Sequence, residues 1–154
     1  MLNDKKELDR YYMRQAIREA EKAFEADEVP VGAILVHQKQ VIGRAYNQVR
    51  LLKDSTAHAE MIAITQGSEN RKSEHLRGAT LYVTLEPCPM CVGAIILSRI
   101  DRLVFGAREP KTGACGSKIH LMAEAKWNHR FKIEEGVLEF ESAALLQEFF
   151  KSKR

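Results

Sequence analysis

The hydrophobic positions along the chain alternate between helical spacing and short apolar runs, a pattern typical of a protein that mixes helices and strands. Apolar residues three and four positions apart predict a first helix over about 8–26. Two β-rich runs follow, at 31–36 and 41–46, and the few polar residues between them form a short turn. Strands joined so tightly are typical of an antiparallel hairpin.

The rest of the chain continues this alternation. The expected elements are a helix over 57–68, a strand over 80–85, a helix from Pro87 or Pro89 to about 98, a strand over 102–107, a strand over 131–137 and a helix over 141–151. The segment 108–129 is polar and shows no clear period, and a loop of that length in a compact domain is usually functional. This order predicts an α/β sandwich on a mixed sheet of five strands, folded as one domain over 1–154. Strands 80–85 and 102–107 are expected to be parallel, with a right-handed connection through the helix between them.

Composition places the chain among ordinary globular proteins. The 154 residues are 45% hydrophobic and 29% charged, which excludes collagen, low-complexity disorder and a disulfide scaffold. We expect no membrane span, since no stretch approaches the ~20 apolar residues required, and no signal peptide, since the first ten residues have no apolar core. These features predict a soluble, cytoplasmic protein. The net charge of +3 permits a polyanionic partner without requiring one.

Two of the three cysteines stand close together in the segment Pro87-Cys88-Pro89-Met90-Cys91. Residues three apart in the first turn of a helix face the same side, and a helix amino terminus favours thiolate over thiol. The pair therefore suits two ligands of a metal site. From this motif alone, a thioredoxin-type redox pair and two ordinary buried thiols remain alternatives. A structural zinc ribbon would need a second such pair, which the sequence lacks.

The triplet His58-Ala59-Glu60, near the start of the preceding predicted helix, supplies a third ligand. One strand and one crossover separate it from the cysteine pair, so both helices can begin at the end of the sheet where open α/β sheets bind ligands. One histidine nitrogen and two thiolates leave a fourth tetrahedral position for water, the pattern of a catalytic zinc. Glu60 lies about 200° around an ideal helix from His58, which makes it a poor ligand but lets it reach a water on the metal. A carboxylate there takes up and redelivers protons, so the set predicts metal-assisted hydrolysis.

Together these residues resemble the signature of the zinc-dependent nucleobase deaminases, and the flanking sequence is most similar to the bacterial tRNA adenosine deaminases within that superfamily. The similarity covers the chain from residue 10 onward. The matching segments are Glu28-Val29-Pro30-Val31-Gly32-Ala33, Thr56-Ala57-His58-Ala59-Glu60, Leu81-Tyr82-Val83-Thr84-Leu85-Glu86-Pro87-Cys88, Phe105-Gly106-Ala107-Arg108, Lys111-Thr112-Gly113-Ala114, Asn128-His129-Arg130, and Leu145, Phe149 and Phe150. The resemblance implies the three-layer α/β/α sandwich of the cytidine deaminase-like fold.

The resemblance also implies a specific reaction. One Zn²⁺ per chain, held by His58, Cys88 and Cys91, would activate a water that attacks C6 of an adenine. Glu60 would move the proton to the ring and then to the departing amine, which yields inosine and ammonia. The expected substrate is the wobble adenosine of an arginine tRNA, splayed out of the anticodon loop, and no organic cofactor is implied. Members of the family pair into homodimers, so a second copy of the chain is an expected partner.

Four further residues are expected to bind the substrate on the same basis: Asn47, Arg108, Glu109 and Lys111. Asn47 matches the base-binding asparagine of the family, and its amide offers both a donor and an acceptor. At Arg108-Glu109-Pro110 the chain departs from the usual Arg-Asp, so the carboxylate sits one methylene further out. The segment 51–54 also departs from the usual short polar loop, and Cys115 matches no ligand position.

Two other functions share part of these features. One is a deaminase of free bases or nucleotides, such as guanine or cytosine, and the other is a non-catalytic, zinc-stabilised RNA-binding module. The basic residues Lys151, Lys153 and Arg154 favour a polyanionic substrate over a free base. Glu60 beside an incomplete ligand set argues against a purely structural zinc.

Overall fold

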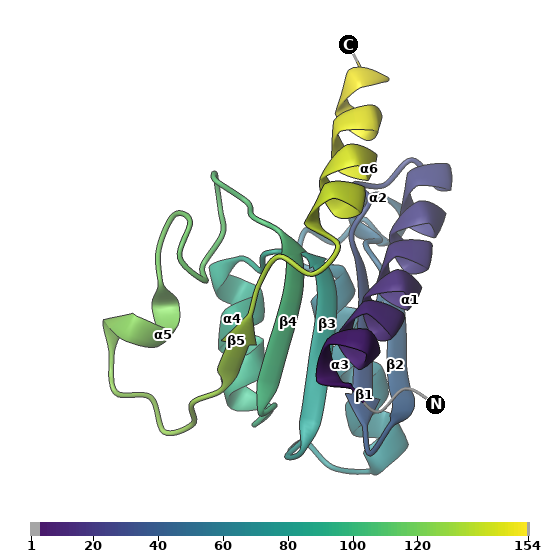
Figure 1. Cartoon of the computed structure of the whole chain (residues 1–154). Coiled ribbons are helices and arrows are strands. Elements are labelled where there is room, and N and C mark those ends of the chain that lie inside the picture. The colour runs from purple at the N-terminus through teal and green to yellow at the C-terminus, as the bar shows by residue number, and fades with distance from the viewer. Residues whose placement is uncertain (1–3, 154) are drawn as a thin grey trace.

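The computed structural model describes residues 4–153 and shows helices on both faces of one five-stranded sheet (Figure 1). The elements in chain order are α1 (Lys5–Glu25), β1 (Gly32–His37), β2 (Gln40–Tyr46), α2 (Val49–Leu52), α3 (Ala59–Arg71), β3 (Ala79–Leu85), α4 (Pro89–Leu97), β4 (Arg102–Ala107), α5 (Leu121–Glu124), β5 (Lys132–Glu134) and α6 (Glu139–Lys151). The strand order is β2-β1-β3-β4-β5. Strand β1 is antiparallel to β2 and β3, and β4 is parallel to β3 and β5. The predicted mixed sheet of five strands is confirmed.

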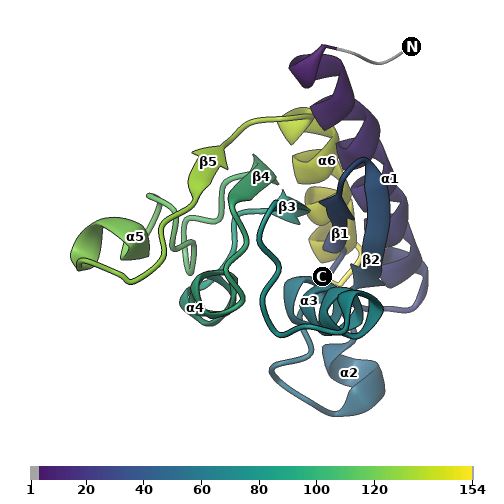
Figure 2. The ribbon, with the colours of Figure 1, turned by 90° about the horizontal axis from the view of Figure 1, so that it is seen from below.

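Alternate residues of the central strands face opposite layers of the sandwich, as the two-residue period of a strand requires. On β1, Ala33 and Leu35 pack in the core under α3 and α4, whereas Ile34 and Val36 pack against α1. On β3, Tyr82 packs on the same side as Ile34. Figure 2 shows α1 and α6 over one face and α3 and α4 over the other. The predicted three-layer α/β/α sandwich is therefore confirmed, and burial on both faces explains the unbroken apolar runs of these strands.

Three differences from the predicted elements have physical causes. Helix α1 begins three residues earlier than predicted because the Asp4 carboxylate caps it, accepting a hydrogen bond from the Lys6 backbone N–H at 3.3 Å. Helix α2 was not predicted, since four residues are too few to show a helical period. Strand β5 is shorter than the predicted 131–137, since Gly136, with a φ of 82°, turns the chain out of extended conformation.

The parallel pairing of β3 with β4 determines where a site can form. Both strands end at the same edge of the sheet, β3 at Leu85 and β4 at Ala107, and these two residues are partners in the register. Open α/β sheets bind ligands beyond this edge. Within residues 4–153, no helix is long and apolar enough to cross a lipid bilayer.

Candidate metal centre

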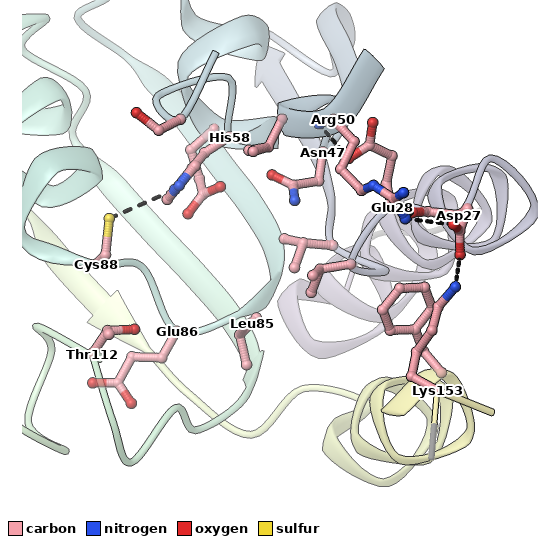
Figure 3. Close-up of a pocket in the computed structure, with 16 residues that line it drawn as sticks. Asp27, Glu28, Asn47, Arg50, His58, Leu85, Glu86, Cys88, Thr112 and Lys153 are labelled. Carbon is pink, nitrogen blue, oxygen red and sulfur yellow. Dashed lines mark hydrogen bonds and ion pairs between the residues drawn. The ribbon is translucent and has the colours of Figure 1, made fainter. Parts of the chain in front are cut away.

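Two helices begin at the carboxyl end of β3 and bring together the predicted ligands. His58 is the N-cap residue of α3, and Cys88 is the N-cap residue of α4. Neither side chain caps its own helix, so the imidazole and the thiol face each other (Figure 3). Pro89 occupies the first turn of α4, where its missing N–H leaves no hydrogen bond unmade, and Cys91 follows in that turn. The starts of α3 and α4 therefore bring three possible ligand atoms together.

The distances between these atoms suit a tetrahedral metal ion. His58 Nδ1 lies 3.6 Å from Cys88 Sγ and 3.6 Å from Cys91 Sγ. All three possible ligand atoms lie within 4.8 Å of one another. A nitrogen at about 2.0 Å and a sulfur at about 2.3 Å from one tetrahedral zinc ion stand roughly 3.5 Å apart. The observed separations match this value, so the three side chains fit a metal with three protein ligands.

The protonation of the cluster also favours a cation. The hydrogen bond with Cys91 lowers the pKa of Cys88 to about 4. Burial opposes this shift, and the hydrogen bond with His58 adds to it. The hydrogen bond with Cys88, followed by burial, raises the pKa of Cys91. The contact with Cys88 raises the pKa of His58, although burial opposes it. The cluster thus holds a thiolate and shared protons, and a divalent cation can take the place of those protons.

Glu60 lies in the first turn of α3, two residues after His58, with only 4% of its surface exposed. Burial raises the pKa of its carboxyl group above the ordinary value. The side chain lines the same cavity as His58 and Cys88. A carboxyl group on the lining of the cavity can take up and release a proton, as general acid–base chemistry requires.

The cavity beside the ligands has a volume of about 490 Å³, within the range of roughly 300–1,000 Å³ typical of small-molecule sites. Asn47 lines it and is 8% exposed. The backbone N–H of Asn47 donates to the Val31 carbonyl at 3.0 Å, which holds the residue at the end of β2. The full lining is Asp27, Glu28, Val29, Val31, Asn47, Val49, Arg50, Ser55, His58, Glu60, Leu85, Glu86, Cys88, Thr112, Phe149 and Lys153. Five of the predicted site residues thus share one place: four in this cavity, and Cys91 beside it.

The other three predicted site residues lie on the loop after β4. Among the described residues of this loop, Thr112 lines the cavity, whereas Arg108, Glu109 and Lys111 do not. Arg108 Nη2 lies 2.6 Å from the Glu135 carboxylate. Glu109 accepts a hydrogen bond from the Lys111 backbone N–H at 2.9 Å, so its longer side chain folds back on its own loop. Contact of these residues with a substrate stays a prediction.

Charged residues also line the cavity where α1, α2 and α6 meet. Asp27 pairs with both Arg50 and Lys153, and Lys153 Nζ lies 5.4 Å from the centroid of the Phe149 ring (Figure 3). These ion pairs are exposed, so they are weak and screened by salt. Phosphate groups of a polyanion can therefore compete with Asp27 for both cations.

Two buried carboxylates of the cavity had no role in the sequence interpretation, although both lie in the matching segments. Glu28, 1% exposed, accepts hydrogen bonds from the backbone N–H groups of Arg50 at 3.0 Å and Leu51 at 2.7 Å. It therefore holds α2 in place beside the cavity. Glu86 holds the loop after β4 in the same manner. The sequence feature that could have identified Glu28 and Glu86 is an acidic residue directly beside an apolar run that is predicted to be buried.

Cys115 lies apart from the cluster. It is a free cysteine with 8% of its surface exposed, and it is not a member of the His58–Cys88–Cys91 group. Burial raises the pKa of its thiol to about 12. A thiol that stays protonated at neutral pH is a poor ligand and nucleophile.

Known proteins match this chain over nearly its whole length. A family model described as MafB19-like deaminase matches residues 7–154. The tRNA-specific adenosine deaminase of Bacillus subtilis (strain 168) is 47% identical over 146 residues, which cover 95% of this chain and 91% of the relative. That of Aquifex aeolicus (strain VF5) is 48% identical over 144 residues, 94% of this chain and 95% of the relative. A solved structure from biochemical and structural studies of A-to-I editing by tRNA:A34 deaminases at the wobble position has a TM-score of 0.86, with 46% identity and 88% and 99% coverage of the two chains.

The ligand set predicts that Cys88→Ala loses the metal. At a free zinc concentration about 1,000-fold above the Kd, loss of binding should lower the free energy of unfolding by about 4 kcal/mol. Metal content by mass spectrometry and thermal unfolding measure the two effects. Cys115→Ala is the matched control and should retain one metal per chain. Stoichiometric metal in Cys88→Ala would contradict the assignment.

Proposed function

The chain belongs to the MafB19-like deaminase family and to the tRNA adenosine deaminases, and from this premise we propose that it deaminates the wobble adenosine of an arginine tRNA by zinc-dependent hydrolysis. The convergence of His58, Cys88 and Cys91 beside a cavity that Glu60 lines is the observation that carries this proposal. In it, these three residues hold one zinc ion per chain. When bound, zinc supplies the Lewis acidity that lowers the pKa of a water molecule to about 7.

Glu60 carries the proton in this proposal. Hydrolytic deamination of adenosine breaks the C6–N6 bond, forms a C6–O bond and releases ammonia. One proton of the water therefore reaches ring N1, where it stays in inosine, and the other reaches the departing amine. Glu60 carries these two protons in turn. Its burial and its place on the lining of the cavity beside His58 and Cys88 support the role.

Asn47 orients the base in this proposal. Its amide offers a donor and an acceptor, which suit the ring nitrogens and amine of a purine. Its side chain is 8% exposed and lines the same cavity as His58 and Glu60, which supports the role. An extruded base then lies between this amide and the metal.

Basic groups around the cavity bind the RNA backbone. Arg50 and Lys153 line the cavity, Lys111 is exposed on the loop after β4, and Lys151 ends α6. Arg154, also predicted to bind RNA, lies outside the described residues. Lys153 and Arg50 pair with the exposed carboxylate of Asp27, and phosphate can replace this weak interaction.

The proton-transfer role predicts that Glu60→Gln retains the fold and one zinc per chain but loses deamination. The amide matches the carboxyl group in shape and cannot exchange protons near neutral pH, so the rate should fall by about 10²–10⁴-fold or more. Zinc content and ammonia release are measured on the same sample. Near-normal turnover would show that another group moves the protons.

The tRNA substrate predicts a steep salt dependence. An anticodon stem-loop with adenosine at the wobble position should turn over faster than free adenosine, cytidine or guanine, measured as ammonia release at matched concentration. Its affinity should fall linearly with the logarithm of salt concentration. Removal of residues 151–154 should make that slope shallower by about 0.7 for each phosphate that the variant no longer neutralises, and should leave the zinc content unchanged. Faster turnover of a free base or nucleoside would favour the small-molecule deaminase.

We further propose that the chain acts as a homodimer, as family resemblance implies, and that α4 contributes to the interface. One face of this helix is apolar and uncovered: Leu97 is 75% exposed, and a Cβ placed on Gly93 would meet no atom within 4 Å. A glycine inside a helix costs about 0.5–1 kcal/mol relative to alanine. Close packing of a second helix against this position would explain why it holds a glycine.

The dimer predicts a mass by light scattering of about twice the 17.5 kDa chain. Leu97→Glu should lower the mass to that of one chain, because a charge cannot be buried there without a partner. Phe140→Glu, which changes an 81% exposed residue of α6, is the matched control and should remain dimeric. A wild-type monomer with full activity on the stem-loop would contradict the proposal.

A further inference from the structure

One buried carboxylate, that of Glu86, fastens the loop after β4 to the metal centre. We call residues 108–117 the substrate loop, since they include Arg108, Glu109 and Lys111. Glu86 follows the last residue of β3 and is separated from Cys88 by a single proline. It is 3% exposed, and Figure 3 shows it beside Thr112 of the substrate loop.

Both oxygens of this carboxylate accept hydrogen bonds from the loop. Oε1 accepts from the Glu109 backbone N–H at 3.1 Å and from the Ser117 hydroxyl. Oε2 accepts from the backbone N–H groups of Cys115 at 2.9 Å and Ser117 at 3.1 Å. One side chain thus holds both the beginning and the end of the substrate loop. Since a buried charge without partners is costly, the carboxylate and the loop depend on each other.

The middle of the loop lies directly against the same carboxylate. A Cβ added to Gly113 would lie 2.4 Å from Cδ and 2.5 Å from Oε2 of Glu86, and 2.5 Å from the Glu109 carbonyl oxygen. Only glycine permits this approach. The next residue, Ala114, donates its N–H to the Pro87 carbonyl at 2.8 Å. The substrate loop is therefore packed on the two residues that precede a metal ligand.

We propose that Glu86 is a positioning residue that sets the substrate loop relative to the metal centre, an inference that rests on the proposed function. Glu86 lines the same cavity as Glu60, Cys88 and Thr112, so a shift of its carboxylate moves one wall of the cavity against the reacting groups. The loop carries the residues predicted to contact RNA. Its displacement weakens substrate binding more than the chemical step.

Glu86→Gln tests this role. The amide replaces one acceptor oxygen by a donor that faces a backbone N–H of the loop, so at least one of the four hydrogen bonds is broken. Unpaired buried polar groups of this kind should raise the KM for the wobble-adenosine stem-loop by about 5- to 150-fold. The kcat should stay within roughly threefold, and zinc at one per chain. Backbone amides of residues 109–117 should exchange hydrogen faster than in the wild type, while those of α3 and α4 should not.

Two further variants complete the experiment. Glu124→Gln makes the same chemical change on an exposed residue of α5 and should leave KM and exchange unchanged. Ser117→Ala removes only the hydroxyl hydrogen bond, and we expect a KM increase of about threefold with faster exchange in the same segment. Because Ser117→Ala removes only one of the four hydrogen bonds, it provides the test of the positioning role if Glu86→Gln does not fold.

Separate outcomes contradict the two proposals. An unchanged KM, or unchanged hydrogen exchange over residues 109–117, in folded and zinc-loaded Glu86→Gln would overturn the positioning role. A loss of zinc, or a lower kcat at unchanged KM, would also overturn it. A purely structural role would lower thermal stability without changing the KM of the folded enzyme. A wild-type chain that does not deaminate the stem-loop contradicts the proposed function instead, and hydrogen exchange then still shows whether Glu86 holds the loop.

Discussion

The meeting of two helix amino termini at the carboxyl end of β3 is the constraint on which the site depends. His58 and Cys88 occupy N-cap positions, where Ser, Thr, Asp or Asn would stabilise a helix by about 1 kcal/mol. Neither residue makes a capping hydrogen bond with its side chain. The helices are held instead by burial, since Ala63 of α3 and Ile95 of α4 are fully buried against the sheet. The side chains at the two termini are therefore available to a metal.

Three buried carboxylates line the cavity, and their hydrogen-bond partners indicate different roles for them. Glu28 and Glu86 accept hydrogen bonds from backbone N–H groups, and in this way hold α2 and the substrate loop. Although burial opposes it, the hydrogen bonds from Ser117 and from the loop backbone lower the pKa of Glu86. Burial raises the pKa of Glu60. Environments that push two carboxyl groups apart in pKa are typical of a site in which one stays charged and the other exchanges protons.

The sequence predicted the larger elements correctly and the smaller ones poorly, for a physical reason. Strand β4 matches its predicted range, because a run that is buried on both faces is continuously apolar. Helix α2 has only four residues, and Glu28, more than twenty residues earlier, accepts hydrogen bonds from two of its N–H groups. No local pattern carries that information.

By itself, the sequence determined the period of each long element and the chemistry of the donor set, because both depend on residues that are close along the chain. His58, Glu60, Cys88 and Cys91 follow from that local chemistry together with the family resemblance. Only the tertiary structure decided that three of them meet within 4.8 Å, and that Glu86 ties a loop 23 to 31 residues away to the metal centre. Those contacts arise from the parallel pairing of β3 with β4 and from hydrogen bonds in a buried space. Non-local pairing of this kind leaves no period in the sequence, since its two halves are specified in separate segments.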